Sequence, residues 1–240
     1  MDKIIRAIQD FYRNETKDFD LLKQYQSSSS AKARIRSFSY ALQNAKTEQT
    51  IGACYEGIVG EYADLLFDPI AQSIVLASIV HCIEKAGAIC VLDAGCGLGL
   101  EACFLAQHFP STAFIATDIS SRMIQATQLR IQRLHVMNVA THRVAHSALP
   151  CVIEEATCDF AYTFGSFHYI TDADCLNTFM QFAHILMNGG TFVICGPVHA
   201  DGDLYQRCAK MTGFVFVGPL KTIIIEKIPR VLIWKFVKKQ

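Results

Sequence analysis

An acidic residue followed by three alternating glycines is the stretch of this sequence best suited to hold a ligand. Asp93 is followed by Gly95, Gly97 and Gly99. Glycine has no side chain and tolerates positive φ, so a ligand can lie directly against the backbone at such a turn. Residues 100–107 repeat apolar side chains at helical spacing, and a helix start offers free N–H donors and a positive dipole end. The pattern therefore predicts a ligand-binding turn between a strand and a helix.

The spacing of the glycines distinguishes this turn from two common nucleotide-binding motifs. A dinucleotide fingerprint requires glycine at the first, third and sixth positions of its run. Counted from Gly95, the sixth position is Leu100, so the fingerprint is incomplete. The chain also lacks the Gly-Lys-Ser/Thr ending of a phosphate-binding loop. A nicotinamide-dependent oxidoreductase is therefore an alternative that Leu100 disfavours, and a turn without any ligand is a second alternative.

The elements that must position this turn follow from short apolar runs that alternate with helical patterns after residue 88. Strands are expected at 89–92, 112–117, 140–145, 158–163 and 191–195. This alternation predicts a parallel sheet with helices on both faces. Two further β-rich segments, 214–226 and 231–238, follow. The connection between them is too short for a parallel crossover, so we expect these two strands to pair antiparallel.

Three helical segments are expected before the sheet, at about 1–25, 31–44 and 55–86, the last interrupted near Asp68 and Pro69. Apolar side chains fall on one face of the first two segments, which is typical of helices that cover another surface. We therefore expect residues 1–54 to form a helical cap or lid and residues 55–240 to form the ligand-binding domain. A dimerisation arm is the alternative interpretation of the N-terminal segment.

Composition narrows the classes of function. The chain has 240 residues, 51% of them hydrophobic, and a formal net charge of +0. It has no run of five or more like charges, so nothing predicts a nucleic-acid or membrane partner. Ten scattered cysteines without a Cys-x-x-Cys pair indicate buried thiols in a reducing compartment, with no metal site expected. Without a signal sequence or a long apolar run, the protein is expected to be cytoplasmic.

The acidic residue two places before three alternating glycines resembles the first motif of class I S-adenosylmethionine-dependent methyltransferases. The expected parallel strands with an antiparallel end also resemble the sheet of that family. The resemblance covers about 55–239 in pattern and Asp93 to Gly190 in motifs. It implies a doubly wound, mostly parallel seven-stranded sheet with an antiparallel C-terminal hairpin, and S-adenosyl-L-methionine as the cofactor.

The resemblance also implies which residues bind the cofactor. Asp118 ends the second expected strand, where a carboxylate can accept the ribose hydroxyls. His146 occupies a position where the family usually carries an acidic residue for the adenine amino group, so Ser147 or Ala148 could replace that contact. The full predicted set is Tyr62, Asp93, Gly95, Cys96, Gly97, Asp118, Ile119, Met123, His146, Ser147, Ala148 and Phe164.

The implied reaction is direct displacement, in which an acceptor attacks a methyl group on a sulfonium. Alignment of the two reactants supplies most of the catalysis, and a base is needed only for a poorly acidic hydroxyl or a protonated amine. His168 follows the fourth expected strand, on the acceptor side, and is the predicted catalytic base. His199 follows the fifth strand and is a second residue that could face the acceptor.

A small, partly apolar molecule is the expected methyl acceptor. The Asn/Asp-Pro-Pro-Tyr/Phe motif of base and glutamine methylation is absent after the fourth strand, and the net charge is zero. Both observations argue against a nucleic-acid substrate. A protein or peptide methyltransferase and an inactive cofactor-binding scaffold are the other interpretations, and a homodimer is an option that the sequence leaves open.

Overall fold

The computed structural model describes residues 2–17, 31–59, 69–197, 200–225 and 228–239. Its helices are α1 (Asp2–Lys17), α3 (Ala31–Asn44), α4 (Glu48–Glu56), α6 (Pro69–Ala86), α7 (Leu100–His108), α8 (Ser121–Arg133), α9 (Asp172–Ile185) and α10 (Gly202–Met211). Two short 3-10 turns, η2 (His146–Cys151) and η3 (Phe167–Tyr169), follow the third and fourth strands. Within these ranges no helix combines the length and the apolar character needed to cross a bilayer.

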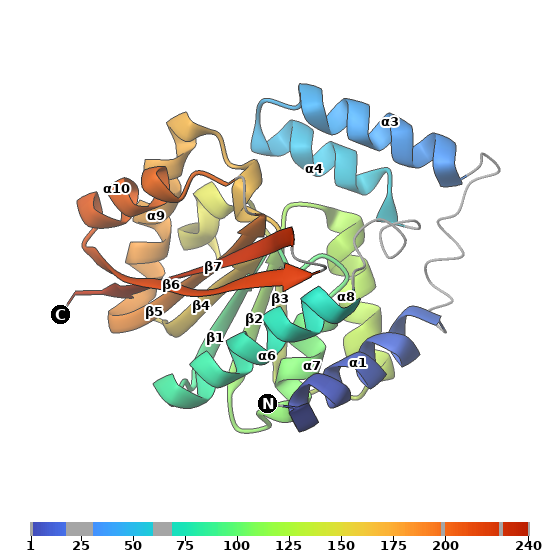
Figure 1. Ribbon diagram of the computed structural model, residues 1–240, viewed down its shortest axis with the longest axis horizontal. Coiled ribbons are helices and arrows are strands. Elements are labelled where there is room, and N and C mark those ends of the chain that lie inside the picture. Colours follow the sequence, from blue (N-terminus) through green and yellow to red (C-terminus); the bar gives the residue numbers. More distant parts are fainter. Residues whose placement is uncertain (1, 18–30, 60–68, 198–199, 226–227, 240) are drawn as a thin grey trace.

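One mixed sheet forms the centre of the molecule (Figure 1). Its seven strands lie in the order β3-β2-β1-β4-β5-β7-β6. Only β7 runs antiparallel to its two neighbours. The predicted doubly wound sheet with an antiparallel C-terminal hairpin is confirmed. The strands are β1 (Cys90–Ala94), β2 (Ala113–Asp118), β3 (Val139–Arg143), β4 (Cys158–Phe164), β5 (Leu186–Pro197), β6 (Phe214–Ile225) and β7 (Ile228–Lys238).

Each face of the sheet is covered by its own hydrophobic core. Successive side chains of a strand point to opposite faces, so Val91 of β1 joins one core and Leu92 joins the other. Helices α1, α6 and α7 pack on the first face, and α9 and α10 pack on the second. Burial on both faces explains why the central strands are continuous apolar runs and do not alternate with polar residues.

Helix α9 ends before the Asn188-Gly189-Gly190 segment. The helix stops at Ile185 because Leu186 adopts an extended conformation, with φ of −83° and ψ of 140°. Leu186 then pairs with Cys158 at the start of β4, and an irregularity in register follows before Thr191 pairs with Phe160. Pairing with β4 therefore overrides the local helical pattern of the last residues before Gly189.

The N-terminal helices take two different places. Ile8 and Tyr12 of α1 are buried against α6 and α7, so α1 belongs to the core and not to a cover over the site. Helices α3 and α4 lie instead beyond the carboxyl ends of the strands, at the top of Figure 1. The predicted helix end near residue 25 lies outside the described residues.

Candidate active site

The glycine turn between β1 and α7 forms the floor of the site. Gly95 and Gly97 have φ of 81° and 53°, a conformation that side-chain-bearing residues rarely adopt. A Cβ built on Gly95 would lie 2.4 Å from the Ser166 Oγ. Because Ser166 also donates to the Ala94 carbonyl oxygen at 3.0 Å, this side chain has little room to move. The sequence therefore needs glycine here to bring two strand ends together.

Asp118, at the end of β2, holds the turn from the side. Its Oδ2 accepts the Gly97 N–H at 3.0 Å, and its Oδ1 accepts the Ser120 N–H at 2.9 Å. Burial raises the pKa of Asp118 to about 6, with a smaller contribution from the negative charge of Glu56 and opposition from these backbone donors. An ionised carboxylate has about four acceptor positions, so Asp118 keeps acceptor capacity toward the cavity beside it.

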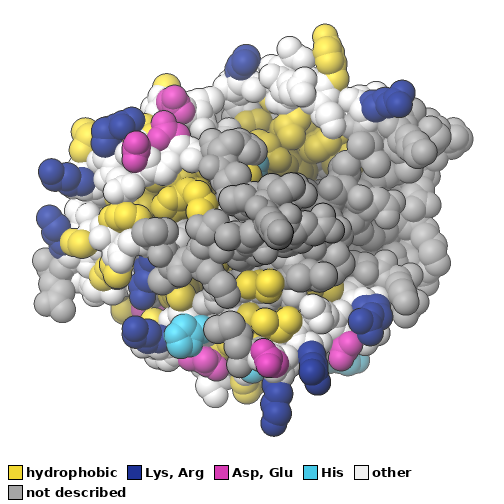
Figure 2. All heavy atoms as spheres, viewed as in Figure 1, with side chains coloured by type: hydrophobic (Ala, Val, Ile, Leu, Met, Phe, Trp, Pro, Cys, Tyr) yellow, Lys and Arg dark blue, Asp and Glu magenta, His cyan; other side chains and the backbone are white. Residues whose placement is uncertain are grey.

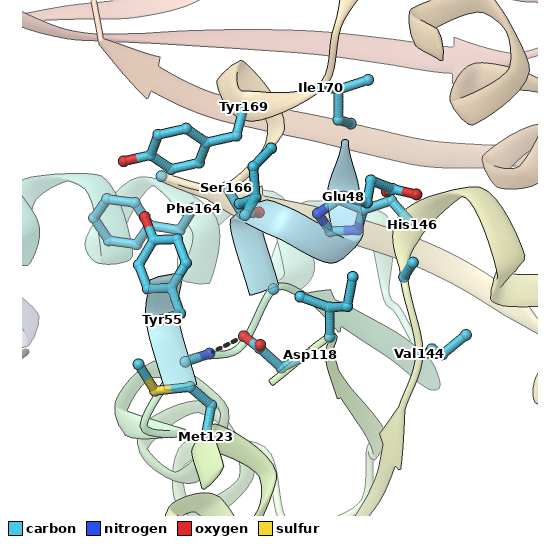
Figure 3. A pocket seen from close by; sticks show the side chains of 16 residues that line it. Glu48, Tyr55, Asp118, Met123, Val144, His146, Phe164, Ser166, Tyr169 and Ile170 are labelled. Atoms are coloured by element: carbon cyan, nitrogen blue, oxygen red, sulfur yellow. Dashed lines mark hydrogen bonds between the residues drawn. The ribbon is translucent and has the colours of Figure 1, made fainter. Parts of the chain in front are cut away.

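A cavity opens above the turn, with an empty volume of about 640 Å³ including the space open to solvent. Its walls come from the ends of β1, β2, β3 and β4 and from α4 (Figure 3). Ligands of open α/β sheets bind at this edge, beyond the carboxyl ends of the strands. The lining residues are Glu48, Ile51, Tyr55, Gly95, Gly97, Asp118, Ile119, Met123, Val144, Ala145, His146, Phe164, Gly165, Ser166, Tyr169 and Ile170.

Helix α4 is fastened over this cavity by a carboxylate at each end. Glu48 accepts a hydrogen bond from the Ser147 hydroxyl and a longer one from the Ser147 N–H, at 3.4 Å. Glu56 accepts the Ser121 hydroxyl at 2.8 Å, at the start of α8. Between these two anchors, a Cβ on Gly52 would lie 2.9 Å from the Ile119 side chain. The helix therefore lies in direct contact with the residue that follows Asp118.

Aromatic rings form one end of the cavity. The Tyr55 ring of α4 lies edge-on to Tyr169 of η3, with ring centroids 5.8 Å apart. On its outer side Tyr55 lies 5.2 Å from Phe38 of α3, also edge-on. Phe164, at the end of β4, lies at the same end of the cavity in Figure 3. Figure 2 shows hydrophobic side chains gathered beneath α3 and α4, so this end of the cavity suits a flat apolar group.

His146 lies at the other end of the cavity, near Glu48 (Figure 3). Its ring packs near Phe167 and Phe182, with centroid distances of 6.4 and 6.1 Å. Burial lowers the pKa of His146 to about 4. The imidazole is therefore neutral at physiological pH and adds no positive charge to the cavity.

Seven of the predicted cofactor-binding residues meet at the cavity: Gly95, Gly97, Asp118, Ile119, Met123, His146 and Phe164. Asp93 and Cys96 lie beneath the turn, 2% and 4% exposed, and are not part of the lining. Ser147 contacts Glu48 behind the wall, and Ala148 follows it in η2. Direct cofactor contacts by these four residues stay predictions.

Asp93 is the most buried carboxyl group near the turn. Burial, together with the nearby negative charge of Glu101, raises the pKa of Asp93 well above its usual value. Its Oδ2 has no hydrogen-bond partner among the described residues. Asp93 therefore lies in an environment that disfavours its charged form.

The predicted catalytic base does not line the cavity. His168 lies in η3 with its ring 4.0 Å from that of Tyr169, and it is Tyr169 and Ile170 that form the wall. An acceptor in the cavity as it stands would therefore not contact His168. Tyr62 and His199 lie outside the described residues.

The sequence analysis placed a cover in residues 1–54 but identified neither helix α4 nor its contacts. Glu48 and Ser147 are 99 residues apart in the chain, and no local pattern indicates that they meet. The nearest signal is Thr47, which caps α4 together with Thr50 and so fixes where the helix begins. Tyr169 and Ile170 could have been found by extending the prediction for His168 to its neighbours in the loop after β4.

The geometry fits S-adenosylmethionine. A side-chain-free turn admits close contact with the backbone, Asp118 offers acceptors for two ribose hydroxyls, and Ile119 and Met123 supply apolar walls for a base. The volume and the mixed polar and apolar lining are those of a small-molecule site.

Comparison with known proteins identifies the same stretch. A family model described as a methyltransferase domain matches residues 91–190. The malonyl-[acyl-carrier protein] O-methyltransferase of Herminiimonas arsenicoxydans is 35% identical over 66 residues, which are 27% of this chain and 25% of that protein. The match thus spans about a quarter of the curated relative.

Solved structures of similar fold cover more of the chain. Magnesium protoporphyrin IX methyltransferase from Synechocystis PCC 6803 superposes with a TM-score of 0.63 at 15% identity, covering 81% of this chain and 99% of that chain. The 4+2 cyclase SpnF superposes with a TM-score of 0.64 at 13% identity, covering 81% of this chain and 97% of that chain. Residues 91–190 thus match a methyltransferase domain, and the strand order and the site agree with the resemblance of this chain to class I S-adenosylmethionine-dependent methyltransferases.

Proposed function

We propose that this protein transfers a methyl group from S-adenosylmethionine to a small, partly apolar molecule by direct displacement. The observation that carries the proposal is the position of the Asp118 carboxylate. It lies beside the glycine turn, in a cavity that is lined by aromatic rings at one end. A nucleoside and an apolar acceptor can therefore lie end to end in one cavity.

The bound cofactor would supply a methyl group on a sulfonium, and the acceptor's lone pair would bond to the methyl carbon as the carbon–sulfur bond breaks. The electron pair of the broken bond would stay on sulfur, and the acceptor would release a proton. The residues of this chain align the two reactants. Asp118 accepts the ribose hydroxyls, and Ile119 and Met123 hold the base by apolar contact. Helix α4, fastened by Glu48 and Glu56, excludes water from above, which favours a productive geometry.

His168 is the proposed general base for an acceptor that must lose its proton during transfer. This role requires the ring to turn from its place beside Tyr169 toward the cavity. Residues 1–54 enter the proposal only through α3 and α4, because α1 is part of the core. A cytoplasmic location and a homodimer are further parts of the proposal. All ten cysteines are free thiols, which is the state expected in a reducing compartment.

Calorimetry with S-adenosylhomocysteine tests the cofactor assignment. We expect micromolar-range binding, and we expect Asp118→Ala to weaken it by about 1–3 kcal/mol, since the hydroxyl groups of the ligand lose their acceptor. Asp172→Ala removes an exposed carboxylate from the first turn of α9 and should leave the affinity unchanged. Binding of NADH in place of S-adenosylhomocysteine would sink the proposal.

Turnover needs its own test, because one protein of similar fold is a cyclase. Purified protein would be incubated with S-adenosylmethionine carrying a labelled methyl group and with pools of small molecules and peptides. Formation of labelled product together with S-adenosylhomocysteine supports methyl transfer. Cofactor binding without transfer to any pool supports the inactive scaffold, and transfer to peptides alone supports a protein methyltransferase.

A further inference from the structure

The charged side chains that line the cavity, among the described residues, are all acidic. Glu48 and Asp118 are its ionisable carboxylates, and among the described residues no lysine or arginine contributes to the lining. The neutral His146 supplies no positive charge. Arg143 lies outside: it is exposed, and its Nε–H donates to the Ile119 carbonyl oxygen at 3.1 Å.

The described cations near α4 lie outside the lining. Lys46 is exposed just before α4, and Arg122 donates to the Glu56 carbonyl oxygen at 2.8 Å. The bound cofactor would bring one net positive charge at neutral pH. That single charge faces two carboxylates, so the cavity stays negative when it is loaded. Clefts with low-dielectric walls concentrate the electric field, so the negative potential of this cavity acts strongly on any further charged group that enters.

We propose that the acceptor site takes a molecule without negative charge, uncharged or cationic, that presents a flat apolar group to Tyr55, Tyr169 and Phe164. This inference rests on the proposed function and narrows its substrate class. A carboxylate or phosphate acceptor would lose its hydration in a cavity that offers no cationic partner among its described residues. An aromatic alcohol or an amine meets no such penalty, and a cation also gains from the tyrosine faces.

Paramagnetic probes measure the sign of the potential without an identified acceptor. Two nitroxides of equal size, one with an amino group and one with a carboxylate, would be added separately to protein with labelled methionine and isoleucine methyl groups. Near the cavity, at Met123 and Ile170, we expect at least twofold stronger relaxation by the cationic probe. Met137 and Met211 are 92% and 71% exposed and serve as internal references. The net charge of zero means that the whole protein does not bias the comparison.

Two matched variants sharpen the test. Ile170→Lys places an ammonium at the acceptor end, and Ile170→Met is its uncharged counterpart of similar length. The lysine variant should abolish or reverse the preference for the cationic probe, while the methionine variant should keep it. If Ile170→Lys does not fold, Glu48→Gln removes one negative charge and should roughly halve the preference.

Equal or stronger relaxation by the anionic nitroxide in the wild type would overturn the inference, and so would a methylated carboxylate or phosphate in the acceptor screen. Measurements with and without S-adenosylhomocysteine separate this failure from failure of the proposed function. Absence of cofactor binding with the cationic preference intact would sink the function alone. Cofactor binding without that preference would sink the substrate class alone.

Discussion

The guanidinium of Arg130 in α8 is buried between the glycine turn and Glu15 of α1. It donates to the Leu98 carbonyl oxygen within the turn, and its Nε–H donates to Glu15 Oε2 at 3.1 Å. Arg130 is 0% exposed and Glu15 only 5%. A helix that never touches the cavity is thus connected through one arginine to the loop that would hold the cofactor.

Glu15→Ala removes the carboxylate that balances this buried charge. We expect a loss of about 3–5 kcal/mol in the free energy of unfolding, the usual effect of breaking one side of a buried ion pair. Chemical denaturation at 25 °C measures it. The same-helix control is Asp10→Ala, which breaks an exposed pair with Arg13 and should change stability by less than about 1 kcal/mol. The double variant Glu15→Ala/Arg130→Met should be more stable than Glu15→Ala, and a still less stable double variant would contradict this account.

Asp118 predicts how cofactor affinity depends on pH. Its pKa of about 6 means that the carboxylate becomes protonated below that pH and loses acceptor capacity for ribose hydroxyls. The affinity for S-adenosylhomocysteine should therefore be constant above pH 7 and fall by up to about tenfold per pH unit below 6. His146, with its pKa of about 4, does not titrate in this range. Calorimetry from pH 5 to 8 tests this, and Asp118→Asn should give a flat profile.

Protonation of Asp118 also changes the stability of the fold, in a direction that follows from its pKa. The folded-state pKa of about 6 lies above the reference value of 3.8, so the folded protein binds more protons between these values. The contribution of Asp118 to stability therefore decreases as pH rises from about 4 to about 6 and is constant above that. Comparison of the unfolding free energies of wild type and Asp118→Asn across this window isolates the effect. An increase in the Asp118 contribution with rising pH would show that the carboxyl is stabilised in its charged form.

Valine substitutions at Gly97 and Gly87 distinguish the effect of backbone strain from the effect of excluding the ligand. Gly97→Val places a branched side chain at φ of 53° in a residue that lines the cavity, and we expect S-adenosylhomocysteine binding to disappear while the protein stays folded. Gly87→Val imposes similar strain at φ of 62°, where nothing lies within 4 Å of a built Cβ. Both variants should lose comparable stability by thermal denaturation, but only Gly97→Val should lose binding. Normal binding by Gly97→Val would mean that the turn does not face the ligand.

His168 is tested by its effect on turnover. If it is the general base, His168→Gln should lower kcat by about 10²-fold or more and leave the affinity for S-adenosylhomocysteine unchanged. His81→Gln removes an exposed histidine from α6 and should have no effect on either. Unchanged kcat in His168→Gln would mean that this ring only packs against Tyr169 within η3.

The sheet could be predicted because its strands carry their own signals. Buried runs ending in Asp93 and Asp118, with glycines and a capping Ser120 directly after them, define where strands stop and helices begin. These positions bring the glycine turn and Asp118 together because β1 and β2 are neighbours in a parallel sheet. Prediction that the turn and Asp118 lie together thus needed no knowledge of contacts distant in the sequence.

The contacts that hold the cover in place could not be predicted in the same way. Glu48 and Glu56 accept hydrogen bonds from Ser147 and Ser121, which are 99 and 65 residues away along the chain. Nothing in the sequence around either glutamate distinguishes it from an ordinary charged residue at a helix end. The structure places α1 in the core and not in the predicted cover, for a related reason. One-sided apolar helices are expected on any covering surface, and periodicity alone does not say whether that surface is a cavity or the core around α6.

The tether at Glu56 gives the last prediction. Its carboxylate accepts the Ser121 hydroxyl at 2.8 Å and lies 3.7 Å from Arg122 Nε, so it fastens the end of α4 that carries Tyr55. Glu56→Gln keeps the length and one acceptor but loses the charge-assisted bonds, which are roughly twice as strong as neutral ones. We expect the dissociation rate of S-adenosylhomocysteine in stopped-flow fluorescence to rise about tenfold with a smaller change in the association rate, since the cover opens more often. Glu154→Gln changes an exposed glutamate outside the cavity and should alter neither rate. A slower association with unchanged dissociation would mean that Glu56 steers the ligand electrostatically and does not hold α4 closed.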